Sequence, residues 1–363
     1  MPSPATRRTF MKSTAAAALA AGLTGPSAAA ETTTKRLKLG FDNFSIRALG
    51  WKADQLLDYA AEQKVDALLI SDLDAYDSLD AAHLKEIGDK ARGLGIELHC
   101  GTLSLCPSSV RFDNKRGTAQ EHAKLLVRVA RDLGVKTARC VVGFAEDRKT
   151  PGGIFARMKD LAGVLRETRN FALDCGVKFA VENHAGDMQS WELVQLIEDC
   201  GADFVGATVD TGNATWTLED PLGCMETLAA HTLTSGIRDS MIWKDEHGAV
   251  VQWTAVGEGC VDFKTIARRW SELTPEVPFI LEIISGFSRP FPYDKAEFWE
   301  PYREVRAAEF RRFQKLADLG KPIPPFKADG PDRKKAEQDY QKAELERSLT
   351  YCRETLSMGR KAT

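Results

Sequence analysis

The sequence shows no excess of basic residues, no CxxC motif and no long apolar stretch after residue 30. It holds 49 Lys and Arg against 52 Asp and Glu, a net charge of −3, which argues against a nucleic-acid-binding surface. The eight cysteines lie mostly within apolar segments, so we expect buried thiols; the spacing leaves a Cys100–Cys106 disulfide open. Because no later segment reaches the ~18 apolar residues of a membrane helix, we expect a soluble mature chain without a membrane anchor.

The first 30 residues are typical of a twin-arginine signal peptide. Arg7 and Arg8 lie in the motif TRRTFMK, an apolar stretch follows at Ser13–Leu23, and three alanines at 28–30 form a small-residue cleavage site. We therefore expect export to the periplasm, with a basic start to a cytoplasmic protein as the alternative. No cysteine lies near the cleavage site, so a lipid anchor is not expected. Export after folding would let a metal site be filled inside the cell.

Strand-like and helix-like segments alternate along the rest of the chain. Apolar runs predict eight strands: Leu37–Phe41, Ala67–Ile70, Ile96–Cys100, Thr137–Val142, Lys178–Glu182, Phe204–Asp210, Leu233–Arg238 and Phe279–Ile284. Helical periodicity predicts the segments between and after them: Ala53–Gln63, Ala81–Leu94, Ala119–Leu133, Phe155–Cys175, Trp191–Cys200, Pro221–Ala230, Phe263–Leu273 and Lys295–Leu319. Glycines at 95, 134, 176 and 201 mark helix ends.

Eight strand–helix units over residues 35–319 predict an α/β fold of the (β/α)₈ TIM-barrel type. An open doubly wound sheet is the alternative, but no GxGxxG motif follows the first strand. Residues 320–363 differ in composition, with a proline-rich connector and then a charged helix at Arg333–Met358. Its apolar stripe (Leu345, Leu349, Cys352 and Leu356) predicts packing against the barrel wall, with a seam between copies of a homo-oligomer as the alternative.

Three carboxylates lie at the ends of predicted strands. Glu182 ends FAVE, Asp210 ends ATVD, and Glu282 lies in FILEII. Buried carboxylates are costly unless they meet a cation or hydrogen-bond donors. The carboxyl ends of parallel barrel strands converge on one face, so these three side chains could share one metal ion and form an active site.

Several motifs in order resemble the xylose-isomerase-like TIM barrels of the sugar phosphate isomerase/epimerase superfamily. They are VENH at 181–184, TVDTGN at 208–213, Ile237-Arg238-Asp239, the run VGEGCVDF at 256–263 and LEI at 281–283. The resemblance spans roughly residues 37–290. It implies that Glu182, Asp210 and Glu282 are metal ligands and that Glu182 and Glu282 also move protons.

The sequence departs from this family at one ligand. The family usually has a histidine on its seventh strand in an H-x-K-D pattern, where this chain has Gly236. His184 could supply the nitrogen ligand, Asp239 or a water could fill the position, or the site could bind metal weakly or not at all. Oxygen-rich donor sets suit Mn²⁺ or Mg²⁺, so a divalent ion is expected, Mn²⁺ first, with Mg²⁺, Co²⁺ or Zn²⁺ as alternatives.

A structural role for the carboxylates is the competing interpretation. Arg238, Arg139 and Arg47 all lie near predicted strand ends and could pair with them. The candidates for substrate contacts are His184, Arg238, Glu258 and His99, and structural roles compete for each. Tryptophans after strands six and seven, at 216, 243 and 253, lie in predicted loops and could face a sugar ring.

The expected function is a divalent-metal-dependent sugar isomerase or epimerase. One carboxylate would remove the proton α to a carbonyl, and another would return it to the enediolate. The substrate would be a small sugar or keto-sugar. A keto-glycoside lyase acting on the same site and a metal-free sugar-binding barrel are the alternatives. A phosphodiesterase is disfavoured because that chemistry on this barrel uses several histidines.

Overall fold

The computed structural model describes residues 36–360 of the chain. The predicted signal peptide, residues 1–30, lies outside the described residues. Within the described part, no helix is long and apolar enough to cross a membrane. All eight cysteines are free, and Cys100 and Cys106 are both buried thiols rather than a disulfide.

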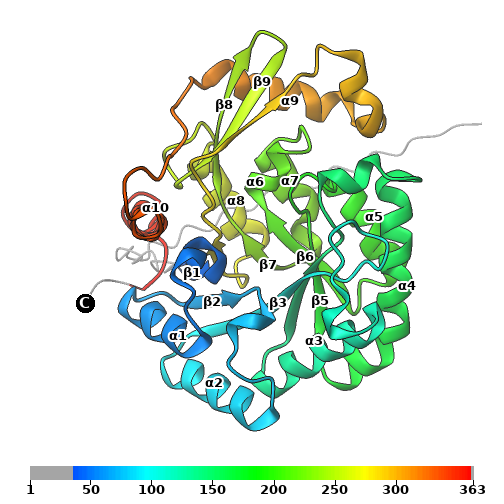
Figure 1. Ribbon diagram of the computed structural model, residues 1–363, viewed down its shortest axis with the longest axis vertical. Helices are drawn as coiled ribbons and strands as arrows, with labels where there is room; N and C mark the ends of the chain where they lie inside the picture. The colour runs from blue at the N-terminus through cyan, green and yellow to red at the C-terminus, as the bar shows by residue number, and fades with distance from the viewer. Residues whose placement is uncertain (1–35, 361–363) are drawn as a thin grey trace, which may run out of the picture. The chain divides into compact units, whose positions relative to one another are not determined.

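Eight parallel strands form the barrel that the sequence predicts (Figure 1). They pair in the order β10-β1-β2-β3-β4-β5-β6-β7, so each strand lies beside its neighbour in the chain. The bounds are β1 Leu39–Asp42, β2 Ala67–Ile70, β3 Glu97–Ser104, β4 Thr137–Val141, β5 Lys178–Glu182, β6 Val205–Asp210, β7 Thr232–Gly236 and β10 Phe279–Leu281. The (β/α)₈ class is therefore confirmed, and the doubly wound alternative is wrong.

The barrel closes between β7 and β10 through a short parallel bridge. Ile237 pairs with Leu281, its N–H donates to the Ile280 carbonyl at 2.7 Å, and the N–H of Glu282 donates to the Ile237 carbonyl at 2.9 Å. This bridge lies next to Arg238 and Glu282. The closing point of the barrel thus fixes two side chains of the candidate site against each other.

Helices cover the outside of the barrel because their apolar faces pack on the strands. The sequence signals for their ends hold locally: Thr118 and Glu121 form a capping box, and Gly134 ends its helix in a left-handed conformation. The bounds are α1 Ala53–Glu62, α2 Ala81–Gly93, α3 Ala119–Leu133, α4 Gly153–Asp174, α5 Ser190–Cys200, α6 Thr211–Thr215, α7 Pro221–Leu228 and α8 Phe263–Leu273. Short 3₁₀ helices are η1 Asn43–Leu49, η2 Leu73–Ala75, η3 Asn114–Arg116, η4 Ala145–Lys149 and η5 Ala229–His231.

A second, antiparallel sheet is a feature that the sequence analysis missed. Its strands are β8 (Asp239–Asp245), β9 (Gly248–Thr254) and β11 (Ser288–Phe291), paired in the order β11-β9-β8. Trp243 and Trp253 therefore lie in strands and not in loops. The predicted helix Lys295–Leu319 is in fact two helices, η6 (Ala296–Tyr302) and α9 (Ala307–Leu319), and α9 packs against β8 (Figure 1).

The charged C-terminal helix, α10 (Arg333–Glu354), packs on the barrel wall beside η1 (Figure 1). It ends four residues before the predicted boundary. Leu345, Leu349 and Cys352 are completely buried, and the N–H of Ala48 donates to Gln341 Oε1 at 2.8 Å. The apolar stripe of this helix is thus an intramolecular packing surface.

Truncating the stripe should destabilise the fold. We expect Leu349→Ala to lower the free energy of unfolding by about 2–5 kcal/mol, because it removes buried methyl groups and leaves a cavity. The control is Leu319→Ala, where the leucine is 71% exposed, and its effect should be within about 0.5 kcal/mol. Urea unfolding of both variants measures the difference. Equal effects would mean that α10 does not hold the barrel wall.

Candidate active site

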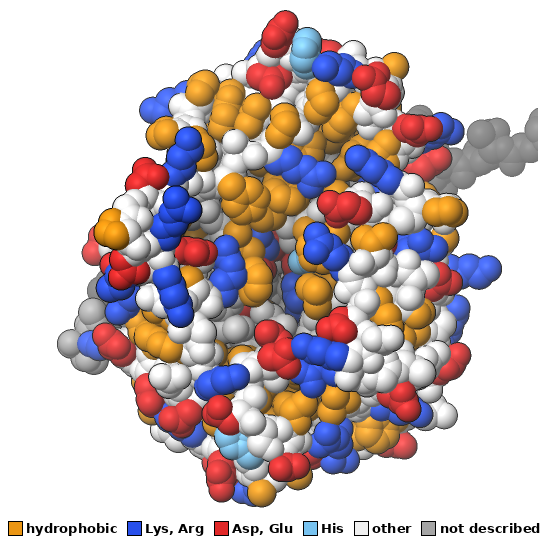
Figure 2. Space-filling view, in the orientation of Figure 1, with side chains coloured by type: hydrophobic (Ala, Val, Ile, Leu, Met, Phe, Trp, Pro, Cys, Tyr) orange, Lys and Arg blue, Asp and Glu red, His pale blue; other side chains and the backbone are white. Residues whose placement is uncertain are grey.

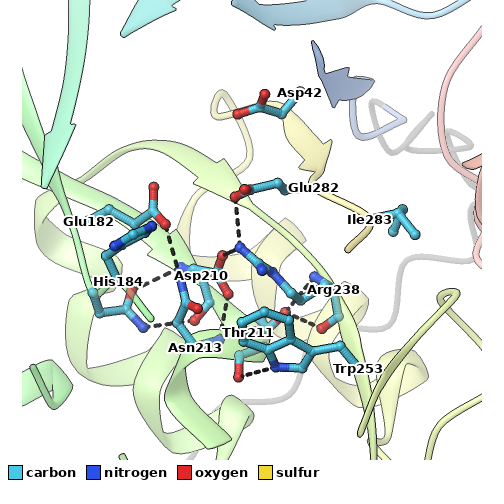
Figure 3. Close-up of polar contacts among 12 residues, drawn as sticks. Asp42, Glu182, His184, Asp210, Thr211, Asn213, Arg238, Trp253, Glu282 and Ile283 are labelled. Atoms are coloured by element: carbon cyan, nitrogen blue, oxygen red, sulfur yellow. Dashed lines mark hydrogen bonds and ion pairs between the residues drawn. The ribbon is translucent and has the colours of Figure 1, made fainter. Parts of the chain in front are cut away.

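The three predicted carboxylates meet at the carboxyl end of the barrel. Glu182 is the last residue of β5, Asp210 is the last of β6, and Glu282 directly follows β10. All three are buried, and one oxygen from each lies within 4.8 Å of the other two. Figure 3 shows these carboxylates turned toward one another. Distant segments of the sequence therefore form one acidic cluster, as predicted.

A cavity of about 600 Å³ opens beside this cluster. Figure 2 shows a hollow on this face of the molecule, bordered by Lys and Arg side chains. Glu282, Arg238 and Asn213 are among the residues that line the cavity, whereas Glu182 and Asp210 do not line it. Glu282 is thus the carboxylate of the cluster that a ligand in the cavity would meet first.

The guanidinium of Arg238 lies between two of the three carboxylates (Figure 3). Its Nη2 donates to Asp210 Oδ2 and, at 2.8 Å, to Glu282 Oε2. Only 2% of Arg238 is exposed, and its Nε has no hydrogen-bond partner in the described structure. Burial raises the pKa of Asp210, an effect that the Arg238 charge opposes and that Glu182 and Glu282 reinforce.

Neighbouring residues leave room for the Arg238 side chain and hold it. The Arg238 guanidinium carbon lies 4.3 Å from the centre of a Trp253 ring, and the indole N–H of Trp253 donates to the Gly212 carbonyl at 2.9 Å. A Cβ at Gly212 would lie 1.9 Å from Arg238 Cγ, so only glycine leaves space for it. A Cβ at Gly236 would lie 3.1 Å from Glu282 Oε2 and 3.2 Å from Asp210 Oδ2. Position 236 therefore faces the cluster without offering a ligand.

A second buried arginine compensates the third carboxylate. Arg139 of β4 donates to Glu182 Oε2 through Nε at 2.6 Å, and to the Thr102 carbonyl through Nη1 at 3.0 Å. The side-chain amide of Asn213 donates to Glu182 Oε1 at 3.0 Å. Both oxygens of Glu182 are therefore engaged. The interpretation that strand-end arginines pair with these carboxylates agrees with the geometry for Arg139 and Arg238, but Arg47 forms no ion pair among the described residues.

A fourth carboxyl group, Asp42 at the end of β1, lies near Glu282 (Figure 3). Burial, reinforced by the charge of Glu282, raises the pKa of Asp42 to about 8, against the charge of Arg139. Its Oδ1 accepts from the Ser71 hydroxyl and the Phe44 N–H, each at 2.7 Å, while Oδ2 has no partner. The raised pKa favours the neutral acid form of Asp42 near neutral pH, which limits the negative charge beside the cluster.

His184 lies at the cavity but outside the carboxylate cluster. Burial, with the nearby charge of Arg139, lowers its pKa to about 3, so its ring is neutral. Its Nδ1 lies 2.8 Å from the Gly143 carbonyl and so carries the proton, which leaves Nε2 as an acceptor. His184 can thus accept a hydrogen bond from a ligand hydroxyl. It does not take the place of the histidine ligand that the family resemblance implies at position 236.

Three other residues considered from the sequence lie elsewhere. Glu258 pairs with Arg347 of α10 at 2.8 Å, and His99 pairs with Glu97 at 3.1 Å; neither lines the cavity beside the cluster. Asp239 accepts from the N–H groups of Gly257 and Gly259, each at 3.0 Å, and so holds a loop rather than a ligand. The structure therefore does not bring Glu258 or His99 to the candidate site.

The acidic cluster could bind a divalent metal ion by the chemistry and spacing of its oxygens. Two features of this chain oppose such an ion. The family's histidine position is Gly236, and the Arg238 guanidinium already contacts two of the three carboxylates. An ion and a guanidinium cannot occupy the same space, so the cluster does not fit a metal while Arg238 keeps this position.

The chain belongs to the xylose isomerase-like TIM barrel family, whose sequence profile matches residues 38–296. A D-psicose 3-epimerase from Clostridium cellulolyticum H10, solved with D-tagatose, has the same fold. It gives a TM-score of 0.51 at 16% identity and covers 78% of this chain and 97% of its own. The resemblance of the sequence to this family is thus confirmed.

Two curated bacterial proteins are similar in sequence. Uncharacterized protein YihM of Escherichia coli (strain K12) is 24% identical over 261 residues, which cover 69% of this chain and 74% of that protein. The 3-oxo-isoapionate decarboxylase of Pectobacterium atrosepticum is 22% identical over 213 residues, covering 58% of this chain and 70% of that enzyme.

Sequence reasoning missed Asp42 and Asn213 as parts of the site. Asp42 ends its strand one residue beyond the predicted boundary, so the strand-end rule would have found it had Leu37–Phe41 been extended. Asn213 lies three residues after Asp210, and its N–H donates to Asp210 Oδ1 at 2.6 Å. That spacing is the signal of an Asx cap on α6.

The pKa of Asp42 should appear in the pH dependence of stability. Asp42 ionises near pH 4 in the unfolded chain and near pH 8 in the folded one, so the folded state holds the extra proton between these values. Its contribution to stability is therefore lost as the pH rises through this window. We expect Asp42→Asn to show a smaller loss of unfolding free energy between pH 5 and pH 8, measured by urea unfolding. Exposed Asp77→Asn is the control, and matching slopes for wild type and Asp42→Asn would contradict the assignment.

Proposed function

We propose that this protein is a sugar isomerase or epimerase that moves a proton α to a carbonyl group. The observation that carries the proposal is the position of Glu282: a buried carboxylate at the barrel mouth that lines the cavity. Arg238 engages only its Oε2, so Oε1 is available to accept a proton. Membership of a family whose solved folds include a sugar epimerase supports this reaction class.

The reaction begins with proton abstraction by Glu282. Removing the α-proton of a keto-sugar places negative charge on the carbonyl oxygen, and a buried cation beside that oxygen stabilises it. Arg238 supplies this charge, and its unpartnered Nε can donate to a substrate oxygen. The unpartnered Oδ1 of Asn213 can accept from a substrate hydroxyl. Arg238 and His184 are thereby the substrate-binding residues among those predicted from the sequence.

We propose that Glu182, protonated in the enzyme–substrate complex, donates a proton to another face or carbon of the enediolate. Glu282 then loses the proton that it removed to solvent, and Glu182 is reprotonated from solvent. Its Oε1 accepts from the side-chain amide of Asn213, so it reaches a substrate only when that hydrogen bond is broken.

The stacked rings of Trp216 and Trp253, with centres 4.0 Å apart, form an aromatic wall at the cavity. Arg238 covers Trp253 at 4.3 Å and Arg289 covers Trp216 at 4.7 Å, so guanidinium groups occupy both outer faces of this stack. A metal-free sugar-binding barrel remains the competing function.

A divalent ion at Glu182, Asp210 and Glu282, with Mn²⁺ the first to test, would stabilise the same oxygen charge only if Arg238 moved away from Asp210 and Glu282. Export by the N-terminal signal would put the reaction in the periplasm. The proton transfer itself depends on the carboxylates of the chain.

Proton transfer can be followed without knowing the product. We expect wild-type protein in D₂O to exchange the α-hydrogen of one member of a keto-hexose and keto-pentose panel, measured by ¹H NMR. Glu282→Gln should lower this exchange about 10²–10⁴-fold. Glu182→Gln should lower product formation while exchange continues, since it acts in the return step.

The surface variant Glu272→Gln serves as the control and should match wild type. Circular dichroism checks the fold of Glu182→Gln, which leaves Arg139 without its carboxylate. Binding of a sugar without any exchange would contradict the enzyme proposal and favour the binding-protein alternative.

A second candidate reaction acts on a keto acid. Arg47, Arg111 and Arg289 line the cavity and pair with no carboxylate among the described residues. All three lie over aromatic rings: Arg47 4.9 Å from Phe44, Arg111 4.8 Å from Phe144 and Arg289 4.7 Å from Trp216. Unpaired guanidinium groups beside a cavity favour a substrate with a carboxylate. The similarity to a 3-oxo-isoapionate decarboxylase agrees with such a substrate.

Loss of CO₂ from a 3-oxo acid leaves the same enolate that proton abstraction produces, so the residues around Glu282 would serve both reactions. The keto-glycoside lyase expected as an alternative also begins with this enolate and then expels a β-substituent. The charge of the preferred ligand separates decarboxylation of a keto acid from an epimerase or a lyase that acts on neutral sugars.

Paired ligands test this charge preference. We expect D-galacturonate to bind about tenfold tighter than D-galactose, measured by isothermal titration calorimetry. The double variant Arg111→Gln/Arg289→Gln should lose this difference while galactose binding stays unchanged. Exposed Arg303→Gln, outside the cavity, is the control. Equal binding of both sugars to the wild type would favour a neutral substrate.

A further inference from the structure

We propose that the guanidinium of Arg238 replaces the divalent metal ion as the resident cation of this barrel site. In this interpretation the acidic cluster is complete without a metal, and Arg238 prevents an ion from binding. Its role in charge stabilisation rests on the proposed function, but the exclusion of metal is a binding property that can be tested separately.

The contacts of Arg238 are those that a shared cation would make. One nitrogen, Nη2, contacts Asp210 Oδ2 and Glu282 Oε2, which are two of the three carboxylates that could hold an ion. The third, Glu182, is held by Arg139, which also lies in the barrel interior. Every carboxylate of the cluster therefore has a guanidinium partner.

The surroundings of Arg238 are shaped for it. Gly236 leaves open the space beside Glu282 and Asp210 where a side chain would lie within 3.1–3.2 Å of their oxygens. Gly212 admits the arginine's Cγ, which any Cβ there would meet at 1.9 Å. Trp253 covers the guanidinium face at 4.3 Å and is itself fixed by a hydrogen bond to Gly212. Gly212 and Trp253, on different segments, thus favour one position of this side chain, and Gly236 leaves its carboxylate partners uncrowded.

A metal ion would also not easily displace the guanidinium of Arg238. Arginine stays protonated at any physiological pH, so no change of pH within that range empties the site. An incoming ion would have to displace a guanidinium that is already dehydrated and bound to two carboxylates, and would leave that charge buried without partners. With glycine at position 236, no histidine ligand compensates for this loss.

The Nε of Arg238 has no hydrogen-bond partner among the described residues, which suggests that a ligand binds there. A buried donor without a partner is costly, and Arg238 lines the cavity. A ligand oxygen that accepts from Nε would remove this cost. The guanidinium can thereby polarise a carbonyl oxygen as a bound metal would, without open coordination positions.

Binding of Mn²⁺ tests the replacement directly. The proteins are the wild type, Arg238→Met, Arg238→Met/Asp210→Asn and the control Arg269→Met, which removes a surface arginine paired with Glu226. Each is treated with EDTA, exchanged into metal-free buffer and titrated with MnCl₂ by calorimetry. We expect Arg238→Met to bind about one Mn²⁺ per chain, at least tenfold tighter than wild type and Arg269→Met. The added Asp210→Asn change should abolish this binding.

Measurements on the wild type keep the proposal testable if Arg238→Met fails to fold, as judged by circular dichroism. We expect no stoichiometric metal by elemental analysis after incubation with MnCl₂, and no change of Tm on adding EDTA or MnCl₂. About one metal per chain in the wild type, with a Tm that EDTA lowers, would overturn the proposal. So would a folded Arg238→Met protein that binds Mn²⁺ no better than wild type. None of these results depends on catalytic activity, so failure of the proposed reaction would be seen independently.

Discussion

The burial of carboxylates at the barrel mouth is the constraint on which the rest of the site depends. Glu182, Asp210 and Glu282 are almost fully buried, and isolated charges in such a place would not be tolerated. Two buried arginines from β4 and the end of β7 meet them, and the raised pKa of Asp42 keeps a fourth charge from forming. Ion pairs between buried carboxylates and arginines therefore determine the arrangement of side chains at the carboxyl end of the barrel.

Glycines and aromatic rings make these ion pairs geometrically feasible. The absence of a Cβ at Gly212 leaves room for the Arg238 side chain, Gly236 leaves the oxygens of Asp210 and Glu282 uncrowded, and Trp253 covers the guanidinium. Trp253 comes from the antiparallel sheet β8-β9-β11, which is added to the eight-stranded barrel. The added sheet is thus part of the site, because it supplies the Trp253 ring against which the Arg238 guanidinium packs.

The eight-stranded barrel could be predicted from local sequence patterns, and part of the antiparallel sheet could also have been predicted from them. Strand runs separated by glycine-ended helices gave all eight barrel strands within a few residues, since parallel buried strands carry continuous apolar runs. The hairpin β8–β9 was missed, although SMIW and AVVQW flank a short polar segment with glycine, a recognisable hairpin pattern. The hairpin follows strand β7 almost directly, and a loop is what usually follows a strand of a (β/α)₈ barrel, so a loop was predicted there.

The sequence alone determined the fold class and the positions of the three carboxylates at strand ends, because strand periodicity and motif order are local properties; it also places glycine at 236, where the family resemblance implies a histidine. Tertiary structure alone decided what those carboxylates contact. Whether Arg238 turns toward solvent, a ligand or Asp210 depends on the space left by Gly212 and on the position of Trp253, which lies 41 residues after Gly212 in the chain. This packing depends on contacts between Arg238, which follows β7, and Trp253 of the added sheet. No local sequence pattern predicts such a contact.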